Sequence, residues 1–175
     1  MKLSEVIALT AFYLKIKSYE ADAERLSLLT KCANLVYRAS AREYLPLYFT
    51  ETAEVSEQAM QFRSLARNVI RIKSVTDETG IEVAYAIRPD CLATETGRIV
   101  VTYAYLPDEA GYEDELDYTD ARVDVSLLAY GTAAEYCLIN GLYEDAGIWD
   151  ARYRAAVMSA ARPRNGVKLP GRRWT

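Results

Sequence analysis

Four stretches of the chain place apolar residues at the spacing of an amphipathic helix. They cover residues 3–15, 22–42, 123–140 and 144–161. The second stretch ends just before Pro46, because the residue that precedes a proline disfavours helical backbone. We expect Asp120 to cap the start of the third helix and Gly141 to stop it, since these residue types favour the two ends of a helix.

Between these helices the pattern changes to the two-residue alternation of strands. The alternation predicts strands at residues 68–75, 81–87 and 98–106, with a further strand at 47–55. Residues 77–80 are expected to form a hairpin turn, with Gly80 at a positive φ. This order of elements predicts an α+β fold, in which helices flank a small antiparallel sheet or meander of three to five strands.

The third predicted helix, residues 123–140, is apolar on nearly all sides, which indicates that it is covered on two faces. Leu128 and Cys137 lie near one side of it, and Tyr130 and Leu138 lie on the other. A second subunit could cover one side, or the helix could be enclosed within its own chain. Since the predicted sheet is modest, we favour a subunit neighbour on one face and keep the enclosed helix as the alternative.

Charge is divided unevenly along the sequence. The net charge of −4 comes from 21 Lys and Arg residues and 25 Asp and Glu residues. Residues 162–175 hold five of the bases and no acid, which leaves a charge of −9 on residues 1–161. The densest acidic segment, residues 108–120, has seven acids and no base. We therefore divide the chain into a helical and β domain, residues 1–161, and a basic C-terminal arm, residues 162–175.

The arm has a composition suited to binding a partner. Its prolines and glycines prevent a regular helix, and Trp174 stands near its end. Arginine and tryptophan are enriched among the residues that dominate protein interfaces, which favours docking on an acidic protein surface. A basic tail can also bind nucleic acid, although five charges release few counterions and the acidic body repels phosphate. A frayed terminus without a partner is the remaining alternative.

The composition excludes several kinds of chemistry. The chain has no histidine, so Ser-His-Asp and Cys-His catalysis and most zinc sites are ruled out. Its three cysteines are too few and too far apart for an all-cysteine site, and we expect buried free thiols. The carboxylates of Glu144, Asp145 and Asp150 suit the N-terminal dipole of the fourth helix and an ion pair with Arg154. We expect no enzyme activity, no metal site and no cofactor.

A chain of 175 residues with 51% apolar and 26% charged side chains can fold around its own core without disulfides or metals. No stretch approaches the ~20 apolar residues of a membrane span. Glu5 interrupts the apolar stretch near the N-terminus, which argues against a signal sequence. We therefore expect a soluble protein that is made in the cytoplasm and has no membrane partner.

Several longer strings of the sequence resemble the head–tail connector, or adaptor, proteins of tailed bacteriophages. The strings are NLVYRASAREYLPL at residues 34–47, VTYAYLPDE at 101–109, LLAYGTAAEYCLINGLYEDAGIWDARYRAAV at 127–157, and the basic KLPGRRW at 168–174. The resemblance runs over most of the chain, while the first helix and residues 48–66 add little to it. None of these strings is a catalytic signature.

The resemblance implies a structural virion protein at the head–tail junction, made in the cytoplasm of a bacterial host. Proteins of this family form a ring, by habit a dodecamer, between the portal protein and the tail or tail-completion proteins. DNA passes through the ring without sequence-specific binding. The alternative that we keep is a small nucleic-acid-binding module with a basic tail.

Residues of this chain can be assigned to the two contacts that such a ring needs. For the arm that grips the portal we choose Arg162, Arg164, Lys168, Leu169, Arg172, Arg173 and Trp174. For packing between neighbours in the ring we choose Tyr130, Ala134 and Leu138 on the third helix.

Overall fold

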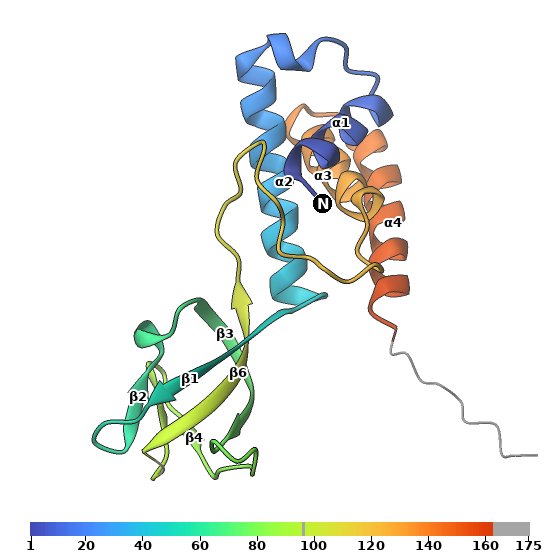
Figure 1. Cartoon of the computed structure of the whole chain (residues 1–175). Helices are drawn as coiled ribbons and strands as arrows, with labels where there is room; N and C mark the ends of the chain where they lie inside the picture. Colours follow the sequence, from blue (N-terminus) through green and yellow to red (C-terminus); the bar gives the residue numbers. More distant parts are fainter. Residues whose placement is uncertain (96, 163–175) are drawn as a thin grey trace, which may run out of the picture.

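The computed structural model describes residues 1–95 and 97–162, which divide into a helical lobe and a β lobe (Figure 1). Over these residues the chain forms four α-helices and two three-stranded antiparallel sheets, which confirms the α+β class. The helices are α1 (Leu3–Tyr13), α2 (Ala23–Glu43), α3 (Val125–Ile139) and α4 (Tyr143–Ala160). The strands are β1 (Leu47–Glu54), β2 (Ala59–Gln61), β3 (Asn68–Thr76), β4 (Ala86–Ile87), β5 (Cys91–Ala93) and β6 (Arg98–Leu106). Short 3-10 helices lie at Tyr19–Ala21 and Phe62–Ser64.

All four predicted helices form, but the start of α3 differs from the prediction. Its cap is Asp124, whose side chain accepts a hydrogen bond from the Leu127 N–H at 2.9 Å. The expectation that Asp120 caps this helix is wrong, because a turn separates Asp120 from α3. The Asp120 carboxylate instead accepts from the Arg122 Nε–H at 2.9 Å. Sequence spacing cannot distinguish the two aspartates, since both precede the same apolar pattern.

Helix α3 lies at the centre of the helical lobe, in contact with α1, α2 and α4. Gly131 allows these helices to approach closely, because a methyl group at this position would lie 2.6 Å from Val36 Cγ1 and 3.0 Å from the Tyr153 ring. The Tyr153 hydroxyl lies 2.8 Å from Ser40 Oγ in a hydrogen bond that joins α4 to α2. The small residues of α3 are therefore used for packing within the chain.

Strand β6 is the centre of the larger sheet, whose strand order is β1-β6-β3. It pairs with β1 from Leu47 opposite Tyr105 to Glu54 opposite Arg98. The smaller sheet has the order β2-β5-β4. The side chains of Ile99, Val101 and Tyr103 are fully buried, so β6 carries much of the core of the β lobe.

The predicted turn at residues 77–80 forms, with Gly80 at φ +87°. The Asp77 carboxylate accepts hydrogen bonds from the backbone N–H groups of Thr79 and Ile81, both at 2.9 Å. The expected strand at residues 81–87 is reduced to β4 and to a bridge that joins Thr76 to Glu82. The order is therefore not a meander, because β3 pairs with the longer and more apolar β6 instead of with the segment that follows it.

The acidic segment 108–120 joins the two lobes, because it leaves β6 and runs along α2 before it reaches α3 (Figure 1). The Tyr105 hydroxyl donates to Asp117 Oδ2 at 2.9 Å, and the Tyr37 hydroxyl accepts from the Asp117 N–H at 3.0 Å. The Tyr118 hydroxyl donates to the Leu45 carbonyl at 3.0 Å. Burial raises the pKa of Tyr105 to about 12, so this hydroxyl keeps its proton across the neutral range. The segment is thus tied to both lobes.

The three cysteines, Cys32, Cys91 and Cys137, are buried and free, as expected. Burial raises the pKa of the Cys32 thiol to about 11 and also raises the pKa of Cys137. A thiol with a raised pKa and a covered sulfur is a poor nucleophile and a poor metal ligand at neutral pH. Cys32 and Cys137 therefore serve packing.

Candidate interaction surfaces

The structure places the three residues chosen for ring packing in three different environments. Ala134 is only 5% exposed and is covered by its own chain. Tyr130 is half-buried in a cluster of three rings, with its centroid 5.3 Å from Tyr13 and 6.0 Å from Trp149, while Tyr13 and Trp149 lie 5.1 Å apart. Leu138 is 47% exposed at the C-terminal end of α3. Of the three, Leu138 presents the most surface to a partner.

These positions change the argument about α3. The helix is covered by α1, α2 and α4 of the same chain, which is the alternative that its apolar pattern left open. Its apolarity alone therefore gives no support for a subunit neighbour. The assignment of Tyr130, Ala134 and Leu138 to a ring contact stays a prediction, and its support now comes from the exposed end of the helix.

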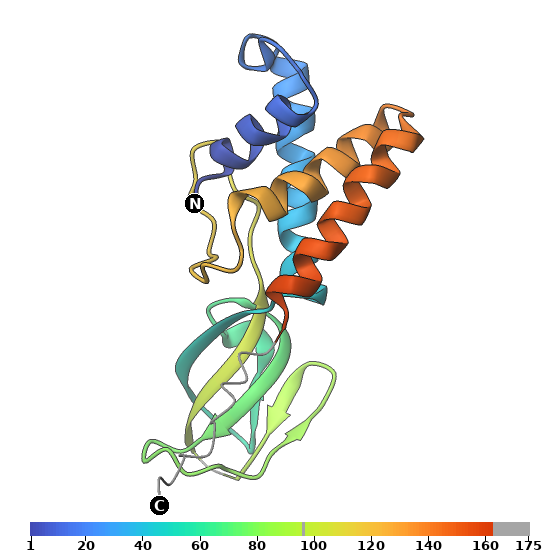
Figure 2. The same ribbon diagram turned by 90° about the vertical axis from the view of Figure 1, so that its right-hand side faces the viewer.

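Large apolar side chains are exposed where α3 turns into α4, at the end of the helical hairpin that projects from the lobe (Figure 2). Gly141 makes this turn with φ +74°, a backbone conformation that is unfavourable for residues with a Cβ. Contiguous exposed apolar surface on a protein commonly marks a contact with another molecule. We call this surface the hairpin end, and its apolar residues are Leu138, Ile139, Leu142, Tyr143 and Ile148.

The hairpin end is acidic as well as apolar. Residues 123–151 contain five acids and no base. Glu144 and Asp145 are exposed in the first turn of α4, where the helix dipole favours negative charge. Burial, with a smaller contribution from the charge of Asp150, raises the pKa of Glu135 on α3. The surface therefore combines protruding apolar side chains with carboxylates at its edge.

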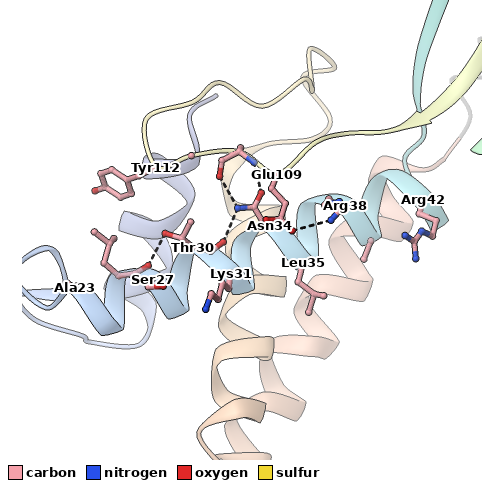
Figure 3. A pocket seen from close by; sticks show the side chains of 14 residues that line it. Ala23, Ser27, Thr30, Lys31, Asn34, Leu35, Arg38, Arg42, Glu109 and Tyr112 are labelled. Atoms are coloured by element: carbon pink, nitrogen blue, oxygen red, sulfur yellow. Dashed lines mark hydrogen bonds and ion pairs between the residues drawn. The ribbon is translucent and has the colours of Figure 1, made fainter. Parts of the chain in front are cut away.

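A groove of about 640 Å³ lies along the outer face of α2, bordered by the acidic segment (Figure 3). Asn34 holds this border in place, since its Nδ2 donates to the Ala110 carbonyl at 2.9 Å and its Oδ1 accepts from the Ala110 N–H at 2.7 Å. Arg38 adds an ion pair with Glu109, at 3.2 Å between Nη1 and Oε1. We call this surface the α2 groove.

The free charges of the α2 groove are positive. Lys31 and Arg42 are exposed on the same stripe of α2 as Leu35 and Arg38. Neither Lys31 nor Arg42 forms an ion pair with any residue in the described ranges. Within the same ranges, Arg38 Nε is buried and has no hydrogen-bond acceptor. The groove is thus an apolar surface with unneutralised basic side chains.

The arm begins at the waist between the lobes, beyond the last turn of α4 (Figure 2). Arg122 Nη1 donates to the carbonyl of Arg162 at 3.2 Å, which ties the first residue of the arm to the segment that precedes α3. The remaining residues assigned to portal binding, Arg164, Lys168, Leu169, Arg172, Arg173 and Trp174, lie outside the described residues. Portal binding by the arm therefore stays a prediction.

The three carboxylates expected to stabilise α4 or pair on its surface are all found on that helix, one in an ion pair and two exposed to solvent. Asp150 pairs with Arg154 across one turn, with 2.9 Å between Oδ2 and Nε, as the spacing predicted. Glu144 and Asp145 point away from the core at the hairpin end. No group of three or more acids or cysteines in residues 1–95 and 97–162 is placed to hold a metal ion. These surfaces can bind a partner through apolar contact and charge pairing.

Comparisons with known proteins add no assignment. A scan against models of protein families finds no family that matches the chain, and no curated protein matches it. Among the described helices, none is long and apolar enough to cross a membrane.

Sequence reasoning identified Leu138 but missed the rest of the hairpin end and the whole α2 groove. A signal for the groove was present, because Lys31, Leu35 and Arg42 fall on the side of the helix opposite its apolar stripe. The border of the groove was not predictable, since the contact between Asn34 and Ala110 joins residues that are far apart in the chain. A signal for the hairpin end was the absence of any base from residues 123–151.

Proposed function

We propose that this chain is a structural virion protein that forms a ring between the portal and the tail of a tailed bacteriophage. One observation carries the proposal. The strings at residues 101–109 and 127–157, which resemble connector proteins, include the end of β6 and most of the α3–α4 hairpin, and this hairpin ends in exposed apolar surface. A protein that bridges others needs separate contact surfaces, and the hairpin end, the α2 groove and the basic arm consist of different residues.

Each part of the chain has a role in this proposal. Residues 162–175 anchor the ring to the portal through their five bases and Trp174. The helical lobe makes the contacts between neighbours, and tail or tail-completion proteins bind on the side away from the portal. The net charge of −9 on residues 1–161 keeps DNA from adhering as it passes, because like charges repel phosphate.

Deletion of residues 163–175 tests the anchoring role. We expect the truncated chain to keep its circular dichroism spectrum and melting temperature and to lose copurification with the portal. A matched control replaces the exposed Arg63 and Arg88 of the β lobe by Gln, and the corresponding arm variant replaces Arg172 and Arg173 by Gln. The arm variant should weaken portal binding and the β-lobe variant should not. Copurification of the folded truncated chain with the portal would overturn the proposal.

A DNA titration tests the other part of the proposal. We expect weak filter binding of duplex DNA at low salt and none at physiological salt, because few phosphate contacts release few counterions. Tight binding with a steep salt dependence would instead favour a small nucleic-acid-binding module whose basic tail follows the phosphates.

A further inference from the structure

We propose that the hairpin end of one copy of this chain docks in the α2 groove of a second copy. The contact then repeats head to tail, with each copy presenting its hairpin end to one neighbour and its groove to the other. The inference rests on the proposed ring and identifies the two surfaces that build it.

The apolar parts of the two surfaces complement each other. The hairpin end is convex, with Leu138, Ile139 and Leu142 exposed at the projecting turn. The groove is concave, and it is lined by Leu26 and Leu35. Its volume of about 640 Å³ is that of a pocket able to enclose a small ligand, so it has room for side chains of a partner. Burial of these exposed side chains is the main source of free energy for association.

The charges of the two surfaces are opposite. The groove presents Lys31 and Arg42 without ion-pair partners in the described ranges. The hairpin end presents Glu144 and Asp145, which form no ion pair with any residue in the described ranges. Complementary charges at an interface favour the correct partner and fix its orientation.

Other pairings of the same surfaces place like charges together. Two hairpin ends would bring the carboxylates of Glu144 and Asp145 against their copies, and two grooves would bring Lys31 and Arg42 against theirs. The basic arm of a neighbour would meet like charges at Lys31 and Arg42, since residues 163–175 carry four bases and no acid. Like-charge contacts of this kind disfavour the wrong partner, so the hairpin end is the occupant that fits the groove.

The two surfaces face different directions on one molecule. The acidic segment that borders the groove runs on one side of α2, and the α3–α4 turn projects on the other (Figure 2). Two different surfaces of one chain make a heterologous contact, which generates a ring when the rotation between copies closes. The placement of the surfaces thus agrees with the ring in which the chain is proposed to work.

Cysteine cross-linking between two full-length variants tests the contact directly. One variant carries Leu35→Cys in the groove and the other carries Leu142→Cys at the hairpin end, while the three natural cysteines stay buried. Under mild oxidation at high protein concentration, we expect the mixture to form at least about tenfold more disulfide-linked heterodimer than a control mixture. The control pairs Leu35→Cys with Ile81→Cys, an exposed residue of the β lobe. Equal yields in the two mixtures, or no linked product from folded chains, would overturn the inference.

Charge reversal distinguishes this specific contact from non-specific association of exposed apolar surface. Lys31→Glu with Arg42→Glu in the Leu35→Cys chain should lower the cross-linked yield about tenfold or more, because it places acids against acids. Glu144→Lys with Asp145→Lys in the Leu142→Cys chain should restore the yield. A yield that the reversal does not lower, or that the second reversal does not restore, would contradict the inference.

The same variants distinguish failure of this contact from failure of the proposed function. If the chain assembles as rings on the portal but the 35–142 cross-link does not form, the contact is wrong and the connector function stands. If the cross-link forms but the full chain does not bind the portal, the contact stands and the connector function is wrong.

Discussion

Leu128 and Leu138 lie near opposite ends of α3 and have the same side chain, but they have different surroundings. Leu128 is 1% exposed among the helices of the lobe, whereas Leu138 is 47% exposed at the hairpin end. The difference comes from the reach of the neighbouring helices, since the α3–α4 hairpin projects past the point at which α1 and α2 cover it (Figure 2). At the C-terminal end of α3, Cys137 still packs in the core, while Leu138 on a neighbouring face is available for a partner.

This comparison explains how a small chain can fold on its own and still keep free energy for assembly. A large apolar side chain contributes about 1.5–3 kcal/mol when it is fully buried. At Leu128 this contribution is made during folding. At the hairpin end much of this free energy is not used in folding, and it becomes available when a second copy buries the exposed side chains. Paired substitutions, one in the core and one at an exposed position, measure how much more a covered side chain contributes to stability than an exposed one.

The largest effect is expected from truncation of the two leucines. Leu128→Ala should lower the free energy of unfolding by about 2–5 kcal/mol, because it leaves a cavity among packed helices. Leu138→Ala should change it by less than about 0.5 kcal/mol, since the side chain is half in solvent already. Urea denaturation at a dilute protein concentration gives both values. Equal losses for the two variants would show that the two ends of α3 are covered alike.

The next effect is expected from the two glycines Gly131 and Gly147. Gly131→Ala should destabilise the chain by about 1–3 kcal/mol, because the added methyl group would lie 2.6 Å from Val36 Cγ1. Gly147→Ala should stabilise it by up to about 1 kcal/mol, since no atom lies within 4 Å of the added methyl group and alanine favours helix. Thermal unfolding of the two variants should show shifts of opposite sign. A shared sign would contradict the close packing at Gly131.

A smaller effect is expected from removal of a hydroxyl. Tyr153→Phe should cost about 0.5–1.5 kcal/mol, because it breaks the hydrogen bond to Ser40 that joins α4 to α2. Tyr143→Phe is the matched control at the hairpin end, where the ring is 72% exposed, and it should leave stability unchanged. Denaturant midpoints of the two variants measure the two changes in stability. No loss in Tyr153→Phe would mean that the hydrogen bond adds nothing to the packing of its ring.

The smallest effect is expected at Glu135. Burial, followed by the charge of Asp150, raises the pKa of this carboxyl, so its ionised form is less favourable in the folded state than in the unfolded chain. Glu135→Gln should therefore raise stability at pH 7, by about 0.5 kcal/mol or less at this partly exposed site. The gain should shrink as the pH falls towards ~4.3, the ordinary pKa of glutamate. Protonation of Glu135 in the parent chain then removes the cost of holding an ionised carboxylate at this site, as the substitution does.

Melting temperatures measured between pH 7 and pH 4 test this prediction, with Glu144→Gln as the control that removes an exposed charge from the same hairpin. The control should show no comparable gain at pH 7 that disappears in acid. A gain for Glu135→Gln that grows as the pH falls would contradict the sign of the shift.

Much of the secondary structure was predictable from the sequence, because local patterns determine it. The four helices and the 77–80 turn follow from helical periodicity and from turn residues that act on their own neighbours. The pairing of β3 with β6 was not predictable in this way. Residues 81–87 follow β3 closely in the sequence and are a nearer candidate for pairing with it than β6. Which of the two segments pairs with β3 depends on how much apolar area each pairing buries.

The candidate surfaces were less predictable than the fold. Tyr130, Ala134 and Leu138 share a helix face by spacing, but one ring is stacked, one methyl is covered and one side chain is exposed. Spacing along a helix fixes which side chains share a face and leaves open how far along the helix its neighbours extend. The α2 groove depends on a contact between Asn34 and Ala110 that no local pattern reveals.

The sequence by itself determined the fold class, the absence of histidine chemistry, and the division of charge between an acidic body and a basic arm. These properties depend on composition and on contacts between near neighbours in the chain. Only the tertiary structure decided which apolar residues of α3 and α4 are covered and which remain exposed beside carboxylates. It also decided that the basic face of α2 becomes a groove. The reason is physical, because burial is set by neighbours that meet only when distant parts of the chain are folded together.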